Sequence, residues 1–177
     1  MASARIYVAC LAAYNNGKLH GRWIDVTDPE TVHEEIKAML AESPEPGAEE
    51  WAVHDYEGIP DSLARSWGEY PDLEAICAFA EACDVLNSYE AEAFEIWYCD
   101  RGDTRETNVY TLTEAFREAY EGHYDTPEAF GWEFVDRYDL LRGMPEHLHP
   151  YFDYSAFARD LTLTDYWEQD GHYFRYV

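Results

Sequence analysis

The stretch SYEAEAFEIWYCD, residues 88–100, has enough aromatic side chains to pack into a protein core, yet it carries four carboxylates and no basic residue. The imbalance extends further, because the 35 residues from Ser66 to Asp100 contain nine Asp or Glu and no Lys, Arg or His. A lysine four residues from a glutamate would stabilise such a helix by about 0.3 kcal/mol. The sequence forgoes this stabilisation, which indicates that the negative charge serves a purpose other than folding.

The preceding segment, PDLEAICAFAEACDVL at 71–86, predicts a helix with separate core and acidic faces. Asn87 and Glu90 then form a capping-box pattern, which predicts that a second helix begins there. Because the composition changes near Pro60, we expect a central acidic helical module at residues 61–107. The apolar arc of the first helix consists of Leu73, Ile76, Phe79, Ala80, Cys83 and Leu86, and Glu74, Glu81 and Asp84 lie opposite it.

The N-terminal part, residues 1–60, predicts an antiparallel sheet with one helix. Strand-like runs at 5–14 and 21–26 flank a turn signal at Asn16-Gly17, which favours a hairpin. A helix is expected over 27–43, where Thr27 or Asp28 precedes Pro29 as the start signal. The residues 50–60 have the composition of a further short strand.

The C-terminal part, residues 108–177, predicts helices closed by a hairpin. Thr111 and Glu114 form a capping-box pattern ahead of AFREAYEGHY, residues 115–124. Thr126-Pro127 opens a helix over 127–141, and a further helix is expected over 153–161. Asp170-Gly171 lies between two alternating aromatic runs, which is a strong hairpin signal. The apolar side expected for the 127–141 helix consists of Phe130, Phe134, Val135, Tyr138 and Leu141.

The composition indicates a folded α+β protein with an extreme charge. Hydrophobic residues make up 47% and aromatic residues 16% of the 177 residues, so the formal charge of -25 belongs to a folded body rather than a disordered tail. Such a charge excludes nucleic acid and anionic membranes as direct partners and favours a basic partner. It matches the phosphates of about 12 base pairs of duplex DNA. With no signal sequence or 18-residue apolar run in view, we expect a mature, cytoplasmic protein.

The sequence offers no strong catalytic or metal-binding pattern. The HxH pair His147 and His149 with Asp153 nearby is a weak metal signal, and DRGDTRE, residues 100–106, lacks the glycine position of a calcium loop. Among 37 acidic residues, any chosen carboxylate pair is uninformative. No nucleophile elbow, P-loop or dinucleotide-binding motif is present. We therefore expect no catalytic residues, metal or cofactor, and we expect the four cysteines to be buried free thiols: Cys10, Cys77, Cys83 and Cys99.

Several blocks of the sequence together resemble the ArdA antirestriction proteins. These are RIYVACLAAYNNGKLHGRWIDV at 5–26, EAFREAYEGHYDTPEAFGWEFVDRYDLL at 114–141, MPEHLHPYFDYSAFARDL at 144–161 and DYWEQDGHYFRY at 165–176. The order of the blocks, over nearly the whole chain, is more specific than any one of them. The resemblance implies an acidic DNA mimic that occupies the DNA groove of type I restriction-modification enzymes. It further implies three small modules in a row and an elongated homodimer.

The resemblance also suggests roles for particular residues. The short antirestriction motif of such proteins best matches FVDRYDLLRGMPEHL, residues 134–148, which is less acidic than a mimic surface. We expect this stretch to serve dimer contact or folding, with a dimer interface of Arg137, Tyr138, Leu140, Leu141, Arg142 and Met144. The carboxylates expected to stand in for phosphates are Glu69, Asp72, Glu74, Glu81, Asp84, Glu90, Glu92, Glu95, Asp100, Glu114, Glu118, Glu121, Asp125, Glu128, Glu133, Asp136 and Asp139.

The expected partner is a type I restriction-modification enzyme, through its methyltransferase core and specificity subunit. Two alternatives remain from the residues alone. The chain could be an acidic adaptor or chaperone for a basic protein, or, third, an enzyme. A DNA mimic competes with duplex DNA for one groove, an adaptor need not do so, and an enzyme would turn over a substrate.

Overall fold

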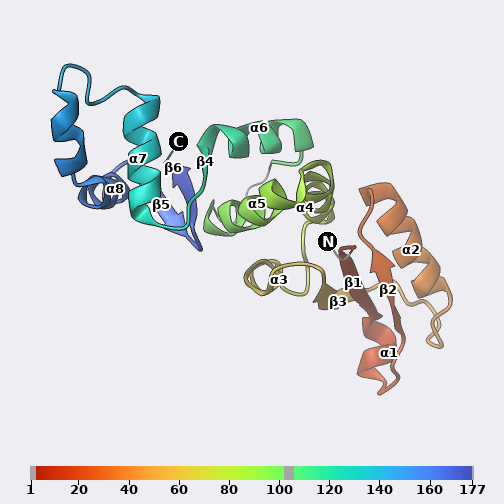
Figure 1. Ribbon diagram of the computed structural model, residues 1–177. Helices are drawn as coiled ribbons and strands as arrows, with labels where there is room; N and C mark the ends of the chain where they lie inside the picture. The colour runs from red at the N-terminus through yellow and green to blue at the C-terminus, as the bar shows by residue number, and fades with distance from the viewer. Residues whose placement is uncertain (1–2, 102–105, 177) are drawn as a thin grey trace. The chain divides into compact units, whose positions relative to one another are not determined.

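The computed structural model describes residues 3–101 and 106–176, and within them it contains helices and two small antiparallel sheets (Figure 1). The α+β class predicted from the sequence is therefore confirmed. The chain divides into two compact units, the first ending at Glu114 and the second beginning at Ala115. The finer division at residues 60 and 107 stays a prediction. Within the described residues, no helix has the length and apolar character that crossing a membrane requires.

The first unit contains a three-stranded sheet in the order β2-β1-β3. Its strands are β1 (Arg5–Cys10), β2 (Gly21–Asp25) and β3 (Trp51–Glu57), and both neighbours run antiparallel to β1. Ile6 and Val8 of the central strand are fully buried, as the alternation of a strand with one covered face predicts. The predicted pairing of the first two runs and the predicted third strand are confirmed.

The first strand-like run was predicted four residues too long. It leaves the sheet after Cys10, and Leu11–Asn15 form the short helix α1, whose Ala13 is buried. The pairing of β1 with β2 and β3 ends at Ala9 and Cys10, so a longer strand would have no partner. Alanine and leucine are good helix formers, and burial of Ala13 stabilises the helix that forms instead. The backbone N–H of Lys18 donates to the Ala13 carbonyl at 2.9 Å, and Gly17 has a φ of +71°, so the predicted Asn16-Gly17 turn closes α1.

Asp28 is the N-cap of helix α2 (Pro29–Ala41). Of the two start residues that the sequence allowed, Thr27 and Asp28, the helix therefore uses Asp28. The Asp28 carboxylate accepts from the Thr31 backbone N–H at 3.0 Å and from the Thr31 hydroxyl at 2.7 Å. These two bonds lower the pKa of Asp28 because they stabilise its charged form. Val32, Ile36 and Met39 are buried at the spacing of one helix face.

Three further helices, α3 (Asp61–Trp67), α4 (Leu73–Val85) and α5 (Ser88–Arg101), complete the core of the first unit. Phe79 lies at its centre, with ring centroids 5.8 Å from Phe94 and 5.0 Å from Tyr98. Two hydrogen bonds tie the sheet to the loop after α3. Tyr56 donates to the Gly68 carbonyl at 2.6 Å, and the backbone N–H of Val53 donates to the Glu69 carbonyl at 2.8 Å.

The second sheet has the order β4-β6-β5, from β4 (Tyr120–His123), β5 (Tyr166–Gln169) and β6 (His172–Arg175). The predicted hairpin at Asp170-Gly171 is confirmed, and both residues have positive φ, 53° and 82°. The strand β4 replaces the end of the helix expected over AFREAYEGHY. Tyr120 pairs with Phe174 rather than continuing a helix, because this pairing gives β6 its second neighbour.

Helix α6 (Val109–Ala119) begins before Thr111, so the prediction of Thr111 as its N-cap was wrong. The Asn108 side-chain oxygen accepts from the Thr111 backbone N–H at 3.1 Å. Asparagine caps a helix at least as well as threonine does, so the sequence offers a start signal three residues earlier. Leu112 and Phe116, four residues apart, lie on the buried face of the helix.

The second unit packs α7 (Pro127–Arg137) against α8 (Tyr154–Thr162), with the 3-10 helix η1 (Glu146–Tyr151) between them in sequence. Thr126 caps α7 as expected, and Asp153, predicted as the first residue of the next helix, instead caps α8; Phe130 stacks on Tyr173 with ring centroids 4.1 Å apart. A Cβ on Gly131 would overlap the Tyr154 carbonyl, so this glycine permits the close approach of the helices. Helix α7 ends at Arg137, four residues earlier than predicted, and Tyr138 and Leu141 lie in the turns beyond it.

Candidate functional site: an acidic surface

Besides Val85 at its end, helix α4 exposes little other than its carboxylates. The predicted apolar arc is buried except for the half-buried Cys83, and Ala75, Cys77, Ala78 and Ala82 are buried as well. These four side chains are small, so other parts of the chain can pack closely against α4 on sides that lie outside the predicted apolar arc. Glu74, Glu81 and Asp84 are exposed, as predicted, and therefore occupy a narrow strip on a helix that is otherwise largely enclosed.

Two of the four carboxylates on helix α5, Glu92 and Glu95, have different surroundings. Glu92 is exposed, whereas Glu95 is half-buried. Burial, and secondly the charge of Glu92, raise the pKa of Glu95, because both disfavour its ionised form. Glu92 is therefore the better placed of the two to meet a partner as a full negative charge.

Two of the predicted site residues cap helices. Asp72 accepts from the backbone N–H groups of Glu74 at 2.9 Å and Ala75 at 3.4 Å, at the start of α4. Glu90 accepts from the Asn87 side-chain amide at 2.6 Å and from its backbone N–H at 3.3 Å. Asn87 in turn accepts from the Glu90 backbone N–H at 3.1 Å, which completes the capping box predicted from the sequence.

The basic residues near the first sheet pair with local acids and leave the central carboxylates unneutralised. Arg5 Nε lies 3.0 Å from Asp25, Lys18 lies 2.6 Å from Glu45, and Arg22 lies 2.6 Å from Glu42. By contrast, within residues 3–101 and 106–176 a group of central acids forms no ion pair. These are Glu69, Asp72, Glu74, Glu81, Asp84, Glu92, Glu95 and Asp100.

Several predicted site residues of the second unit have partners within it. Arg137 lies 2.7 Å from both Glu121 and Glu133, and the Glu121 side chain is only 10% exposed. Asp139 pairs with Arg142 at 3.8 Å, and Arg175 Nη2 lies 3.6 Å from Glu118. The phosphate-mimicking role of these residues stays a prediction. Glu121 also stabilises the fold, because its largely buried carboxylate pairs with Arg137. Asp125, Glu128 and Asp136 are exposed, as is Glu114, the last residue of the first unit.

The residues predicted to form a dimer interface follow or end α7. Tyr138, Leu140 and Met144 are 51%, 48% and 39% exposed, which is unusual for large apolar side chains. Leu141 is half-buried and Arg142 is exposed, whereas Arg137 is engaged with Glu121 and Glu133. Five of the six are thus exposed and Leu141 is half-buried, although Arg137 is tied to acids of its own unit, and their role in a dimer stays a prediction.

His147, His149 and Asp153, the candidate metal ligands, do not form a ligand set in the described parts of the chain. There, no three His, Cys, Asp or Glu side chains cluster as ligands, and His149 Nε2 lies 3.2 Å from the Met144 carbonyl oxygen. Residues 102–105 of the DRGDTRE stretch lie outside the described residues. All four cysteines are free; Cys10 and Cys77 are buried, whereas Cys83 and Cys99 are only half-buried. Burial raises the pKa of Cys83 to about 12, so this thiol is unreactive.

Comparison with known proteins adds one finding to this geometry. A family model described as antirestriction protein (ArdA) matches residues 6–175 of the 177-residue chain. The match therefore covers both sheets and all the acidic helices. No curated protein matches the chain.

Proposed function

Because this chain belongs to the ArdA family of antirestriction proteins, we propose that it blocks type I restriction-modification enzymes by mimicking the DNA that they bind. The acidic surface occupies the basic groove of the methyltransferase core and specificity subunit, where the carboxylates take the places of DNA phosphates. Inhibition is competitive and involves no catalytic step by this chain. The enzyme then fails to engage its DNA.

The observation that carries this proposal is the set of central acids that lack ion pairs within the described chain. Glu74 and Glu81 are seven residues apart on α4, which corresponds to about 10 Å along the helix axis. Glu92 is exposed on the next helix. Charges fixed on packed helices keep their spacing, and a groove built for a regularly spaced polyanion can meet several of them at once. A merely soluble small protein needs a net charge of only about 2 to 8 in magnitude.

The test is displacement of DNA from a purified type I methyltransferase. A fluorescent duplex with the enzyme's bipartite site is bound first, and its anisotropy is followed as the protein is added. Competition predicts complete displacement and an apparent inhibition constant that rises in proportion to the DNA concentration. A ternary complex that retains the duplex would instead indicate an acidic adaptor that binds elsewhere on the enzyme.

Two variants with equal charge change sharpen this test. The first replaces Glu74, Glu81 and Glu92 with glutamine. The second replaces Glu34, Glu49 and Glu50, which are also exposed but lie outside the proposed surface. We expect the first to displace DNA about tenfold less well and the second about as well as the unaltered protein, because exposed ion contacts contribute up to about 1 kcal/mol each. Equal losses would mean that only total charge matters.

A further inference from the structure

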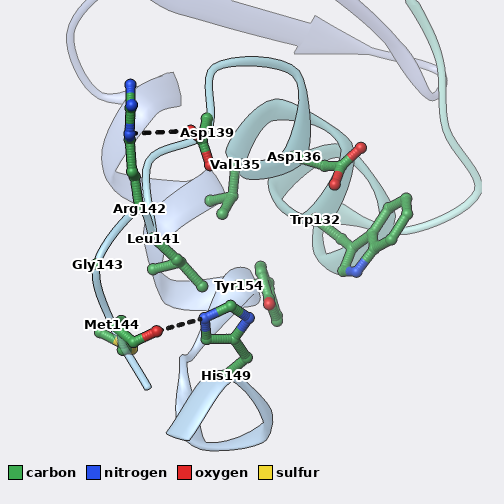
Figure 2. A pocket seen from close by; sticks show the side chains of 10 residues that line it. All are labelled: Trp132, Val135, Asp136, Asp139, Leu141, Arg142, Gly143, Met144, His149 and Tyr154. Atoms are coloured by element: carbon green, nitrogen blue, oxygen red, sulfur yellow. Dashed lines mark hydrogen bonds and ion pairs between the residues drawn. The ribbon is translucent and has the colours of Figure 1, made fainter. Parts of the chain in front are cut away.

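A pocket in the second unit combines aromatic walls with an unneutralised carboxylate (Figure 2). It measures about 520 Å³, and Trp132, Asp136 and Tyr154 contribute to its lining. Trp132 and Asp136 are four residues apart on α7, so their side chains lie on one face of the helix. Tyr154, at the start of α8, reaches the same pocket because Gly131 lets the two helices approach closely.

The charges around this pocket leave one carboxylate without a partner. Arg142 and Asp139 also line it, and they are joined to each other at 3.8 Å. The His149 ring nitrogen lies 3.2 Å from the Met144 carbonyl oxygen. Asp136 forms no ion pair with any residue that the structure describes, and it is exposed. The lining therefore carries a net negative charge that the protein itself does not compensate.

Trp132 is the second unusual feature, because 56% of its surface is exposed. An exposed indole beside a free carboxylate is a favourable site for a cation, which gains from the ring face and from the carboxylate together. A planar guanidinium suits such a site better than an ammonium, since it stacks on an aromatic ring and bonds a carboxylate through two N–H groups.

We propose that this pocket binds an arginine side chain of the partner enzyme. The guanidinium stacks on Trp132 and donates to Asp136, while Tyr154 borders the arginine's methylene groups. The identity of the partner rests on the function proposed above, whereas the preference for a guanidinium rests on the pocket alone. The arginine contact would add a defined anchor to the spread negative charge of the central helices, and thereby fix how the second unit is oriented in the groove.

A direct test uses three blocked tripeptides, acetyl-Gly-X-Gly-amide, in which X is arginine, lysine or citrulline. Binding is followed through the indole N–H resonance of Trp132 in ¹⁵N-labelled protein, assigned with Trp132→Phe. We expect a saturable shift with arginine, at least about threefold weaker binding with lysine, and no saturable shift with the uncharged citrulline. Asp136→Asn should abolish the arginine shift, whereas Asp165→Asn, an exposed change elsewhere in the unit and outside the proposed acidic surface, should leave it intact.

Three outcomes would overturn the inference: no shift with arginine, an equal shift with citrulline, or equal effects of the two aspartate changes. In the DNA-displacement assay we expect Trp132→Ala to weaken inhibition about tenfold and Trp132→Phe less, with Tyr151→Ala, an exposed aromatic outside the pocket, as control. If pocket variants inhibit like the unaltered protein, this inference fails and the proposed function stands. If the unaltered protein leaves DNA bound, the proposed function fails. The tripeptide experiment then still tests whether the pocket prefers a guanidinium.

Discussion

Glu95 shows how a carboxylate can be present in an acidic surface and yet oppose folding. It is half-buried, and burial together with Glu92 raises its pKa above the ordinary value of 4.5. In the folded protein the protonated form is favoured, so the folded state loses stability as pH rises from the unfolded-state pKa through the higher folded-state pKa. Below pH 4.5 this cost is absent, and above the folded-state pKa it is complete.

We therefore expect Glu95→Gln to raise the melting temperature at pH 7 and to have little effect at pH 4, where both side chains are neutral. Thermal unfolding followed by circular dichroism at several pH values measures this difference. Glu74→Gln is the control, because Glu74 is exposed. A gain from Glu95→Gln that is equally large at pH 4 would show that packing, not charge, limits stability at this position.

A second prediction at the residue scale concerns how binding is distributed. In a catalytic site one carboxylate carries a chemical step, and its loss removes most of the activity. A phosphate mimic binds by the sum of many contacts, each contributing about 1 kcal/mol or less when exposed. Single glutamine substitutions at Glu74, Glu81, Glu92 or Glu95 should each weaken DNA displacement only mildly, and combining them should weaken it progressively. One substitution that accounts for nearly the whole loss would refute this view.

At the scale of elements, Arg137 joins the end of α7 to β4. Its guanidinium lies 2.7 Å from Glu121 and donates to the Tyr124 hydroxyl at 3.3 Å. Hydrogen bonding to Glu133 is the main cause that raises the pKa of Arg137, and its charge is permanent. Because the Glu121 side chain is only 10% exposed, removing the arginine would leave a largely buried carboxylate without its cation.

Arg137→Ala is expected to lower the free energy of unfolding by about 2 kcal/mol. Adding Glu121→Gln should recover part of the loss, since the buried charge is then gone. The matched control is Arg142→Ala, whose ion pair with Asp139 is 86% and 71% exposed and should contribute less than about 0.5 kcal/mol. Urea unfolding at one fixed protein concentration measures all three; similar losses for Arg137→Ala and Arg142→Ala would contradict the argument.

The elements that the sequence predicted well are those with local signals. Asp28 before Pro29, the Asn87–Glu90 capping box and Asp170-Gly171 each define an end or a turn through residues within one turn of the chain. Strand β4 has no such signal, because its conformation depends on pairing between Tyr120 and Phe174, over 50 residues away. The point at which helix α6 gives way to strand β4 therefore cannot be predicted from the residues of that segment alone.

The same distinction applies to the candidate site. Exposed acids on α4 were predictable, because helical periodicity alone places Glu74, Glu81 and Asp84 away from the core. The pairing of Glu121 with Arg137 was not, since it joins a strand to a helix. The pocket at Trp132 could not be predicted from the sequence for a similar reason. Trp132 and Asp136 show a helical spacing, but the approach of Tyr154 depends on tertiary packing at Gly131.

At the scale of the whole molecule, the charge count favours two chains acting together. A charge of -25 matches about 12 base pairs, which is short for an enzyme that reads a two-part site, whereas two chains match about 25. Met144 lines the pocket assigned above to the partner enzyme's arginine, whereas the exposed apolar residues Tyr138 and Leu140 offer a surface where two such chains can meet with little repulsion. We propose that they form the dimer contact.

Light scattering at micromolar concentration should therefore give the mass of a dimer. Leu140→Asp should shift it to a monomer, because the change places a charge in the contact. Leu163→Asp is the control, as Leu163 is 76% exposed and lies outside this surface. A monomeric unaltered protein that still inhibits fully would show that one chain suffices.

The salt dependence of inhibition tests whether the whole acidic surface acts as a polyanion. When a basic groove exchanges small anions for fixed carboxylates, the logarithm of the affinity falls with the logarithm of the salt concentration, more steeply as more charges are engaged. Direct binding of the protein to the methyltransferase, measured by calorimetry without DNA, should show such a fall. The Glu74, Glu81 and Glu92 glutamine variant should give a shallower slope than the Glu34, Glu49 and Glu50 variant, because only the first loses charges that enter the groove. Identical slopes for the two variants would mean that the position of the carboxylates does not matter, and an affinity independent of salt would mean that the charge of -25 does not contribute to binding.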